Sequence, residues 1–102
     1  MINSKRKGYR GEKIFRDKVF DYLGVKIRPA PIGSVGDDGK LDRFSLEIKN
    51  TKRIKFNEFV KQARSQSKNE DWLLAIKEQG KDNFTVTMDE KLFFLLIREE
   101  IK

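Results

Sequence analysis

The stretch that decides the fold covers residues 36–49 and reads GDDGKLDRFSLEIK. Its second half alternates strictly, because Phe44, Leu46 and Ile48 are apolar while the residues between them are polar. Successive side chains of a β-strand point to opposite faces of the sheet, so this period predicts a half-buried strand over residues 44–49. The polar face of that strand carries Ser45, Glu47 and Lys49.

The first half of the stretch predicts a hairpin leading into this strand. Glycines at positions 36 and 39 allow the backbone to turn and to present the acids between them. With the hairpin turn near residues 41–43, Asp37 lies opposite the region of Glu47, so that two acids and Lys49 converge. The alternative is an ordinary turn built from Asp and Gly, which is common in any protein.

The flanking sequence predicts helices on both sides of the hairpin. Residues 8–23 have helical periodicity with Gly24 as a stop, and residues 25–28 suit a short strand closed by prolines. A second helix is expected from an Asn57 cap to about Lys68, strands over 72–76 and 84–88, and a last helix capped by Asp89. The order α-β-β-β-α-β-β-α predicts an α/β fold with a mixed sheet flanked by helices, in one domain spanning residues 1–102.

Composition narrows the possible chemistry. The chain has 102 residues, no Cys and no His, which excludes serine and cysteine triads and His-ligated or Cys-ligated zinc. Catalysis would depend on carboxylates, lysines and hydroxyls, and carboxylate oxygens select hard cations such as Mg²⁺ or Mn²⁺. Since the sequence has no long apolar run and no apolar leader, we expect no membrane span and a cytoplasmic location.

Positive charge is concentrated near the N-terminus. The net charge is +7, and residues 1–30 hold nine Lys or Arg against three Asp or Glu. Such a cluster attracts polyanions, most often nucleic acid, although acidic membrane surfaces are an alternative. We expect phosphate contacts from a basic arm at residues 1–8 and from a second basic cluster after the motif strand. The residues expected to make these contacts are Lys5, Arg6, Lys7, Arg10, Lys52, Arg53 and Lys55. For the arm, the alternative is that its basic residues only keep a frayed chain end soluble.

Two of the acids have ordinary explanations as well as functional ones. Glu47 and Lys49 could form a solvated ion pair on one strand face, which stabilises a protein very little. Glu12 falls within the apolar arc of its helix, where a buried carboxylate needs a partner or a metal. Alternatively, Glu12 lies partly exposed in the first helical turn, where the helix dipole favours it.

Three sequence features together carry a resemblance to a known family. Gly36-Asp37 is followed ten residues later by Glu47-Ile48-Lys49, and both are preceded by a helix bearing Arg10-Gly11-Glu12. This pattern resembles the PD-(D/E)XK nuclease superfamily, especially its small phage and archaeal Holliday junction resolvase-like members. The resemblance implies a restriction-endonuclease-like core and covers nearly the whole chain. Here Gly replaces the Pro before Asp37, and Asp38 and Asp42 are alternative candidates for the same role.

The resemblance also implies roles for individual residues. Asp37 and Glu47 would bind Mg²⁺, for which Mn²⁺ substitutes, with the Ile48 carbonyl completing the shell. Lys49 would assist the attacking water, Glu12 would act from the helix, and Ser34 and Gln62 would contribute polar groups. The implied activity is metal-dependent cleavage of branched DNA by a homodimer. The alternatives are a nicking or restriction-like nuclease, a non-catalytic DNA-binding protein of the same fold, and a small anion-binding scaffold.

Overall fold

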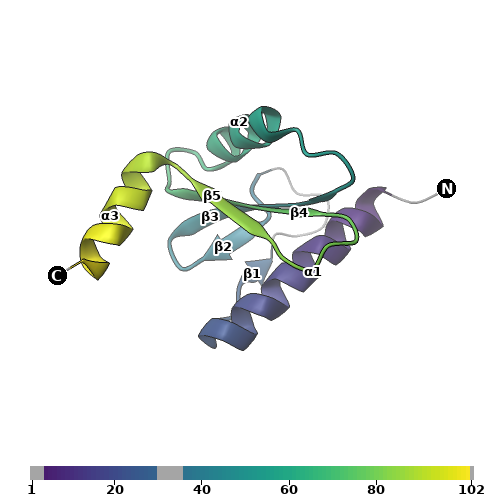
Figure 1. The fold of residues 1–102 in the computed structure, drawn as a ribbon, viewed down its shortest axis with the longest axis horizontal. Helices are drawn as coiled ribbons and strands as arrows, with labels where there is room; N and C mark the ends of the chain where they lie inside the picture. The colour runs from purple at the N-terminus through teal and green to yellow at the C-terminus, as the bar shows by residue number, and fades with distance from the viewer. Residues whose placement is uncertain (1–3, 30–35, 102) are drawn as a thin grey trace.

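The computed structural model describes residues 4–29 and 36–101, with side chains from Arg10 onward. Its element order, α-β-β-β-α-β-β-α, confirms the order expected from the sequence. Figure 1 shows these elements around one sheet. They are α1 (Ser4–Leu23), β1 (Arg28–Pro29), β2 (Gly39–Leu41), β3 (Phe44–Thr51), α2 (Phe56–Gln66), β4 (Trp72–Glu78), β5 (Thr85–Met88) and α3 (Glu90–Glu100).

The sheet is mixed and its five strands follow one another in sequence order. β1, β2 and β3 form an antiparallel meander, and β5 pairs antiparallel with β4. Between them, β3 and β4 run parallel, which requires a crossover that α2 provides. This central pair is therefore covered by helices, as parallel strands usually are.

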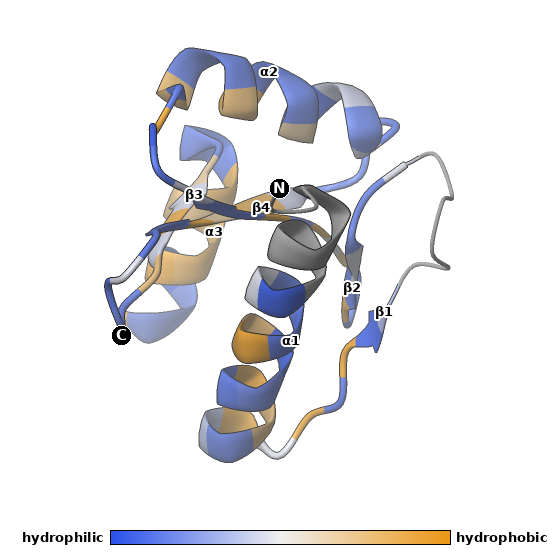
Figure 2. Cartoon of the chain, turned by 90° about the vertical axis from the view of Figure 1, so that its right-hand side faces the viewer, coloured by the Kyte–Doolittle hydropathy of each residue, from blue (hydrophilic) through white to orange (hydrophobic). Residues whose placement is uncertain are grey.

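The two faces of the sheet are covered by different helices, with α1 on one side and α2 on the other (Figure 2). Ala63 of α2 packs with alternate residues of β4, while Val19 of α1 packs with Leu46 of β3 and with Ile27. Because side chains alternate along a strand, β3 gives Leu46 and Ile48 to the α1 side and sends Glu47 and Lys49 to the α2 side. The motif strand thus divides as its sequence predicts.

Several element bounds differ from those expected. α1 already begins at Ser4, so the segment expected to be a basic arm is helical from that residue onward. α2 begins at Phe56 after Lys55, which places Asn57 inside the helix and makes the prediction of an Asn57 cap wrong. The strand expected at residues 25–28 is reduced to Arg28 and Pro29, because β2 offers it only two partner residues. Pro29 is tolerated there because β1 is an edge strand.

The turn and the last cap agree with the sequence. The hairpin turn lies at Asp42 and Arg43, and Asp42 has a φ of 54°. The Asp89 side chain accepts a hydrogen bond from the Lys91 backbone N–H and so caps α3. Among the described helices, none is long and apolar enough to cross a membrane.

Candidate active site

The β2–β3 hairpin brings two adjacent aspartates, Asp37 and Asp38, toward Glu47. Gly39 pairs with Leu46 and Lys40 with Ser45, and the paired residues of β2 end at Gly39. The Asp38 backbone N–H donates at 2.8 Å to the carbonyl of Leu46, the residue with which Gly39 already pairs, so Asp38 lies outside the regular register. The charges of Asp38 and Asp37 both raise the pKa of Glu47, with the larger effect from Asp38, and the expectation that Asp37 binds a metal stays a prediction. Asp42, the other candidate, lies exposed at the turn, at the far end of β2.

Gly39 is required for this arrangement. A Cβ at this position would lie 2.8 Å from the backbone oxygen of Arg28 on β1, and the residue has a φ of +157°. Any other side chain would push β1 away from β2 or force the strand out of register. Gly39 therefore allows β1 and β2 to pair closely just beside Asp38.

Asp38 is half-buried and points along β3. Its Oδ2 accepts a hydrogen bond from the Ile48 backbone N–H at 2.8 Å. Burial raises the pKa of Asp38, while hydrogen bonds from Ile48 and Glu12 and the charge of Lys49 act in the opposite direction. This carboxyl is consequently held in a fixed orientation between the motif strand and α1.

Glu47 is almost completely enclosed, with 2% of its side chain exposed. Burial, followed by the nearby charge of Asp38, raises the pKa of Glu47 to about 7. Its Oε2 lies 3.6 Å from Lys49 Nζ, whereas its Oε1 is buried and has no hydrogen-bond partner among the described residues. A solvated strand-face ion pair is thereby ruled out, because a buried oxygen without a partner is costly and calls for a cation or donor.

Glu12 reaches this place from α1. Since α1 begins at Ser4, Glu12 lies beyond the first turn, and the helix-dipole explanation for this residue is wrong. Burial, then the charge of Asp38 and a hydrogen bond with it, raise the pKa of Glu12 to about 7, while Arg16 and Lys49 lower it. Arg16 Nη1 lies 3.9 Å from Glu12 Oε2.

The approach of α1 to the sheet depends on Gly11. A Cβ at Gly11 would lie 2.5 Å from the Asn50 Cβ, so the helix and β3 touch at this point. Within the part of the chain that the structure describes, the buried Asn50 Oδ1 has no hydrogen-bond partner. Asn50 and Arg16 were not among the residues expected at the site, although Arg16 follows Glu12 by the four residues that bring side chains together on a helix.

Lys49 is the cation of the site. It is partly buried beside Glu47, and its Nζ lies 5.4 Å from the centre of the Phe59 ring on α2. A cation over an aromatic ring is attracted to the π-face, which holds the ammonium group near the carboxylates. The contact of Phe59 with Lys49 became visible only in the structure.

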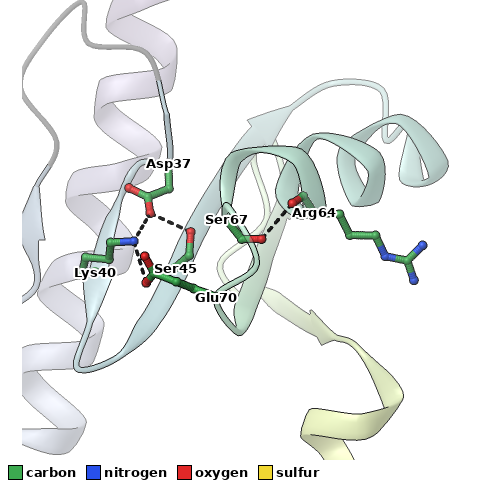
Figure 3. Close-up of polar contacts among 6 residues, drawn as sticks. All are labelled: Asp37, Lys40, Ser45, Arg64, Ser67 and Glu70. Carbon is green, nitrogen blue, oxygen red and sulfur yellow. Dashed lines mark hydrogen bonds and ion pairs between the residues drawn. The ribbon is translucent and has the colours of Figure 1, made fainter.

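Asp37 belongs to a neighbouring network (Figure 3). Its Oδ2 accepts a hydrogen bond from Ser45 Oγ at 2.7 Å and lies 2.7 Å from Lys40 Nζ. Lys40 Nζ in turn lies 3.0 Å from Glu70 Oε2, which belongs to the connection between α2 and β4. The two adjacent aspartates thus have different partners.

The other residues singled out from the sequence lie in several places. Gln62 is exposed on α2, one turn beyond Phe59, and Arg10 is exposed on α1. The exposed Lys52, Arg53 and Lys55 follow the end of β3, near Lys49. The role of the Ile48 carbonyl stays a prediction. Outside the described part of the chain lie Ser34 and the side chains of Lys5, Arg6 and Lys7.

The donor set consists of carboxylate oxygens, which suit a hard divalent cation. Within residues 4–29 and 36–101, no three Asp or Glu side chains form a group ready to hold a metal ion. Asp38 nevertheless interacts with both Glu12 and Glu47, and each interaction raises the pKa of the glutamate. These mutually repelling carboxyls therefore have the chemistry that suits a cation, and their side chains would have to move to enclose it.

Comparisons with known proteins add no relative. The chain matches no family model, no curated protein and no solved structure. Its arrangement of Glu12, Asp38, Glu47 and Lys49 therefore has to be interpreted from its own geometry.

Proposed function

We propose that this protein is a Mg²⁺-dependent DNA endonuclease with a restriction-endonuclease-like core. The observation that carries the proposal is the buried Glu47, whose Oε1 finds no hydrogen-bond partner in residues 4–29 and 36–101, beside Asp38 and Lys49. The mixed sheet, with a parallel pair of strands joined through α2, is compatible with that core. Cleavage at four-way or other branched junctions is part of the proposal and follows from the family resemblance.

In this proposal Asp38 and Glu47 would hold the cation, with Glu12 as a third carboxylate. The bound Mg²⁺ would polarise the scissile phosphate and lower the pKa of a coordinated water. Lys49 would orient the attacking water through its ammonium protons and offset the negative charge that grows on the phosphate. Phe59 limits the positions available to this ammonium group.

The ionisation of Glu12 and Glu47 sets a condition on activity. A carboxyl must be deprotonated to bind a cation, and the pKa of each is raised to about 7. Cation affinity should therefore rise as the pH passes from about 6 to 8. Raised Mg²⁺ concentration should move the onset of activity to lower pH, because the cation competes with the protons.

DNA would be held by charge rather than by base contacts. The exposed Lys52, Arg53 and Lys55 follow β3 directly, so they lie beyond the strand end that carries Lys49. Together with the basic first helix they could contact phosphates on both sides of the scissile bond. Such contacts recognise the shape of the DNA backbone and give affinity that falls as salt rises.

We propose further that two copies associate through α3, which exposes much of its apolar surface. The exposed apolar side chains of α3 and of the residue after it present on the order of 500 Å² of surface per copy, since a fully open aromatic side chain presents about 200 Å². An interface of standard size buries about 800 Å² per partner, of which roughly 57% is apolar, so the area fits a dimer. The exposed apolar residues of α3 and of its C-terminal end are Phe93, Phe94, Leu95, Leu96 and Ile101.

Charge favours a second copy over other occupants of α3. The helix contains three Glu against one Lys and one Arg, although the whole chain has a net charge of +7. Phosphates and acidic membrane surfaces would favour a basic helix, which α3 is not. Self-association through α3 also leaves the basic surface free for DNA.

Cleavage of labelled DNA tests the proposed function. A four-way junction, a nicked duplex and a linear duplex are incubated in Mg²⁺, in Mn²⁺ and in EDTA, with wild type, Glu47→Gln and the exposed control Glu99→Gln. We expect metal-dependent cutting of the junction by wild type and Glu99→Gln and none by Glu47→Gln. Cutting of all three substrates would indicate a nuclease without branch selectivity. Salt-sensitive binding without cutting would indicate a non-catalytic DNA-binding protein.

A further inference from the structure

Asp37 and Lys40 bracket Asp38 in the chain and are joined to each other. Asp37 Oδ2 and Lys40 Nζ form an ion pair at 2.7 Å, which spans Asp38 and Gly39 (Figure 3). The pair thus closes a short loop of backbone around Asp38. The opposite charges of Asp37 and Lys40 hold the two ends of this loop together.

Each member of the pair is also tied to another element. Asp37 accepts the hydrogen bond from Ser45 Oγ at 2.7 Å, and Ser45 is buried in β3 with 1% exposed. Lys40 Nζ lies 3.0 Å from Glu70 Oε2, in the connection between α2 and β4. The backbone on both sides of Asp38 is therefore anchored, on one side to the motif strand and on the other to the loop after α2.

We infer that Asp37, Lys40 and Ser45 act as positioning residues that keep Asp38 in its hydrogen bond with Ile48, beside Glu47. This inference rests on the proposed function, because Asp38 matters to catalysis only if it holds a cation. It assigns Asp37 a different task from that of a metal ligand, although Asp37 is the aspartate that the sequence pattern favoured. The geometry supports this division, since the same Asp37 oxygen already contacts both Ser45 and Lys40.

The contacts among Asp37, Lys40, Ser45 and Glu70, which we call the clamp, should contribute unequally to holding Asp38 in place. The Asp37 side chain is 15% exposed, whereas those of Lys40 and Glu70 are 39% and 49% exposed. Exposed ion pairs are weakened by water and salt, while the bond between Ser45 and Asp37 is shielded. We therefore expect Asp37→Ala to have the largest effect, Ser45→Ala and Lys40→Met smaller ones, and Glu70→Gln the smallest.

Amide hydrogen exchange tests the clamp without reference to catalysis. The Asp38 N–H donates to the Leu46 carbonyl and the Ile48 N–H to the Asp38 carboxylate, so the exchange of both amides in metal-free protein reports on the position of Asp38. Asp37→Ala should speed the exchange of these two amides about tenfold or more, leaving the amides of β4 unchanged. The matched controls are Asp82→Ala and Lys91→Met, which change exposed side chains elsewhere.

Kinetics separate positioning from direct metal binding. For residues that orient a metal ligand, losses of roughly 10-fold to 100-fold are typical, so Asp37→Ala should retain residual cleavage and require more Mg²⁺ for half-maximal rate. Asp37→Asn, which keeps an acceptor for Ser45, should recover part of the rate. A loss as complete as that of Asp38→Asn, with unchanged amide exchange, would overturn the clamp and make Asp37 a ligand.

The proposed clamp and the proposed nuclease activity can be disproved independently of each other. Unchanged exchange at Asp38 and Ile48 in the Asp37→Ala and Lys40→Met variants would overturn the clamp, whatever the cleavage assay shows. Wild-type protein that cuts no DNA in any metal would overturn the nuclease, and the exchange rates would still decide whether the clamp holds Asp38 in place.

Discussion

The backbone N–H of Ile48 donates a 2.8 Å hydrogen bond to Oδ2 of Asp38, and this contact joins the hairpin acid to the motif strand. It fixes the orientation of Asp38 on the motif strand, whereas Asp37 contacts Ser45 and Lys40 and Asp42 lies exposed at the turn. Replacing Asp38 by Asn keeps the shape and removes the charge that would hold a cation. We expect cleavage to fall by a factor of roughly 10² or more, as for other groups that stabilise charge in the transition state.

The control for this substitution is Asp42→Asn, at the exposed hairpin turn. Asn also tolerates the positive φ of this position, so the turn should persist. Steady-state cleavage rates of the two variants make the comparison. Equal losses in both, or a loss confined to Asp42→Asn, would contradict the assignment of Asp38.

Glu47 should make the metal-free protein less stable at high pH. Its pKa is about 7 in the folded chain against 4.5 for the ordinary group, so the folded state binds the proton more tightly than the unfolded state. The unfolding free energy should then fall as the pH rises from about 4.5 to 7, by on the order of 3 kcal/mol for this residue.

Removing that carboxylate should therefore stabilise the fold while removing the activity. In EDTA at pH 8, we expect Glu47→Gln to melt at least about 5 °C above wild type, with a smaller advantage at pH 4.5. Thermal unfolding followed by circular dichroism gives both values, with Glu99→Gln as the control. A destabilised Glu47→Gln at pH 8 would show that the buried carboxylate is compensated by contacts that Gln cannot make.

Gly11→Ala should destabilise the protein, although the same change in an open helix normally has the opposite effect. Ala is favoured over Gly in a helix by about 1 kcal/mol, but a Cβ here would lie 2.5 Å from Asn50 Cβ. Overpacking of this kind costs about 1–3 kcal/mol. Urea denaturation should show a net loss, and cleavage should fall as well because Glu12 moves with α1.

The control for Gly11→Ala is Lys13→Ala, at an exposed position on the same helix. It should leave stability within about 0.5 kcal/mol of wild type. A Gly11→Ala variant as stable as wild type would mean that α1 does not approach β3 as closely as the structure shows.

A charge on the open face of α3 should abolish self-association. Phe94 is 62% exposed, and its ring lies edge-on to that of Phe93 at a centroid distance of 5.5 Å. Phe94→Glu should give a monomer by light scattering at concentrations where wild type is a dimer. A buried charge without a partner is costly, whereas the same charge in a monomer faces water.

The substitution should spare the fold, since the buried contact of α3 is made by Leu92. A wild type that is monomeric at all concentrations would disprove the proposed α3 dimer. A control at Arg98→Gln, on the same helix, should leave the association unchanged.

The basic residues after β3 should set the salt dependence of DNA binding. Lys52 and Arg53 are exposed just beyond Thr51. The double variant Lys52→Gln with Arg53→Gln should bind duplex and junction more weakly, and the slope of log affinity against log salt should decrease by about 1–2. Binding titrations over a range of salt concentrations measure this, with Lys91→Gln and Arg98→Gln as the matched pair.

Local periodicity in the sequence was enough to predict much of the fold. The alternation over residues 44–49 correctly predicted β3 and placed Glu47 and Lys49 on one face. The hairpin turn and the Asp89 cap were confirmed because each depends on a few neighbouring residues. Helix starts were less predictable: Asn57 can cap a helix, yet α2 begins before it, since Phe56 starts the helix without any side-chain cap.

What the sequence by itself determined is the order of the elements and the two sides of the motif strand, because these follow from side-chain periods within each element. Only the tertiary structure decided that Asp37 contacts Ser45 and Lys40 while Asp38 accepts from Ile48, since these partners meet only when β2 pairs with β3. Likewise, only packing brought Glu12 to Asp38. That contact depends on how closely α1 approaches β3 at Gly11, a distance between segments far apart in the chain.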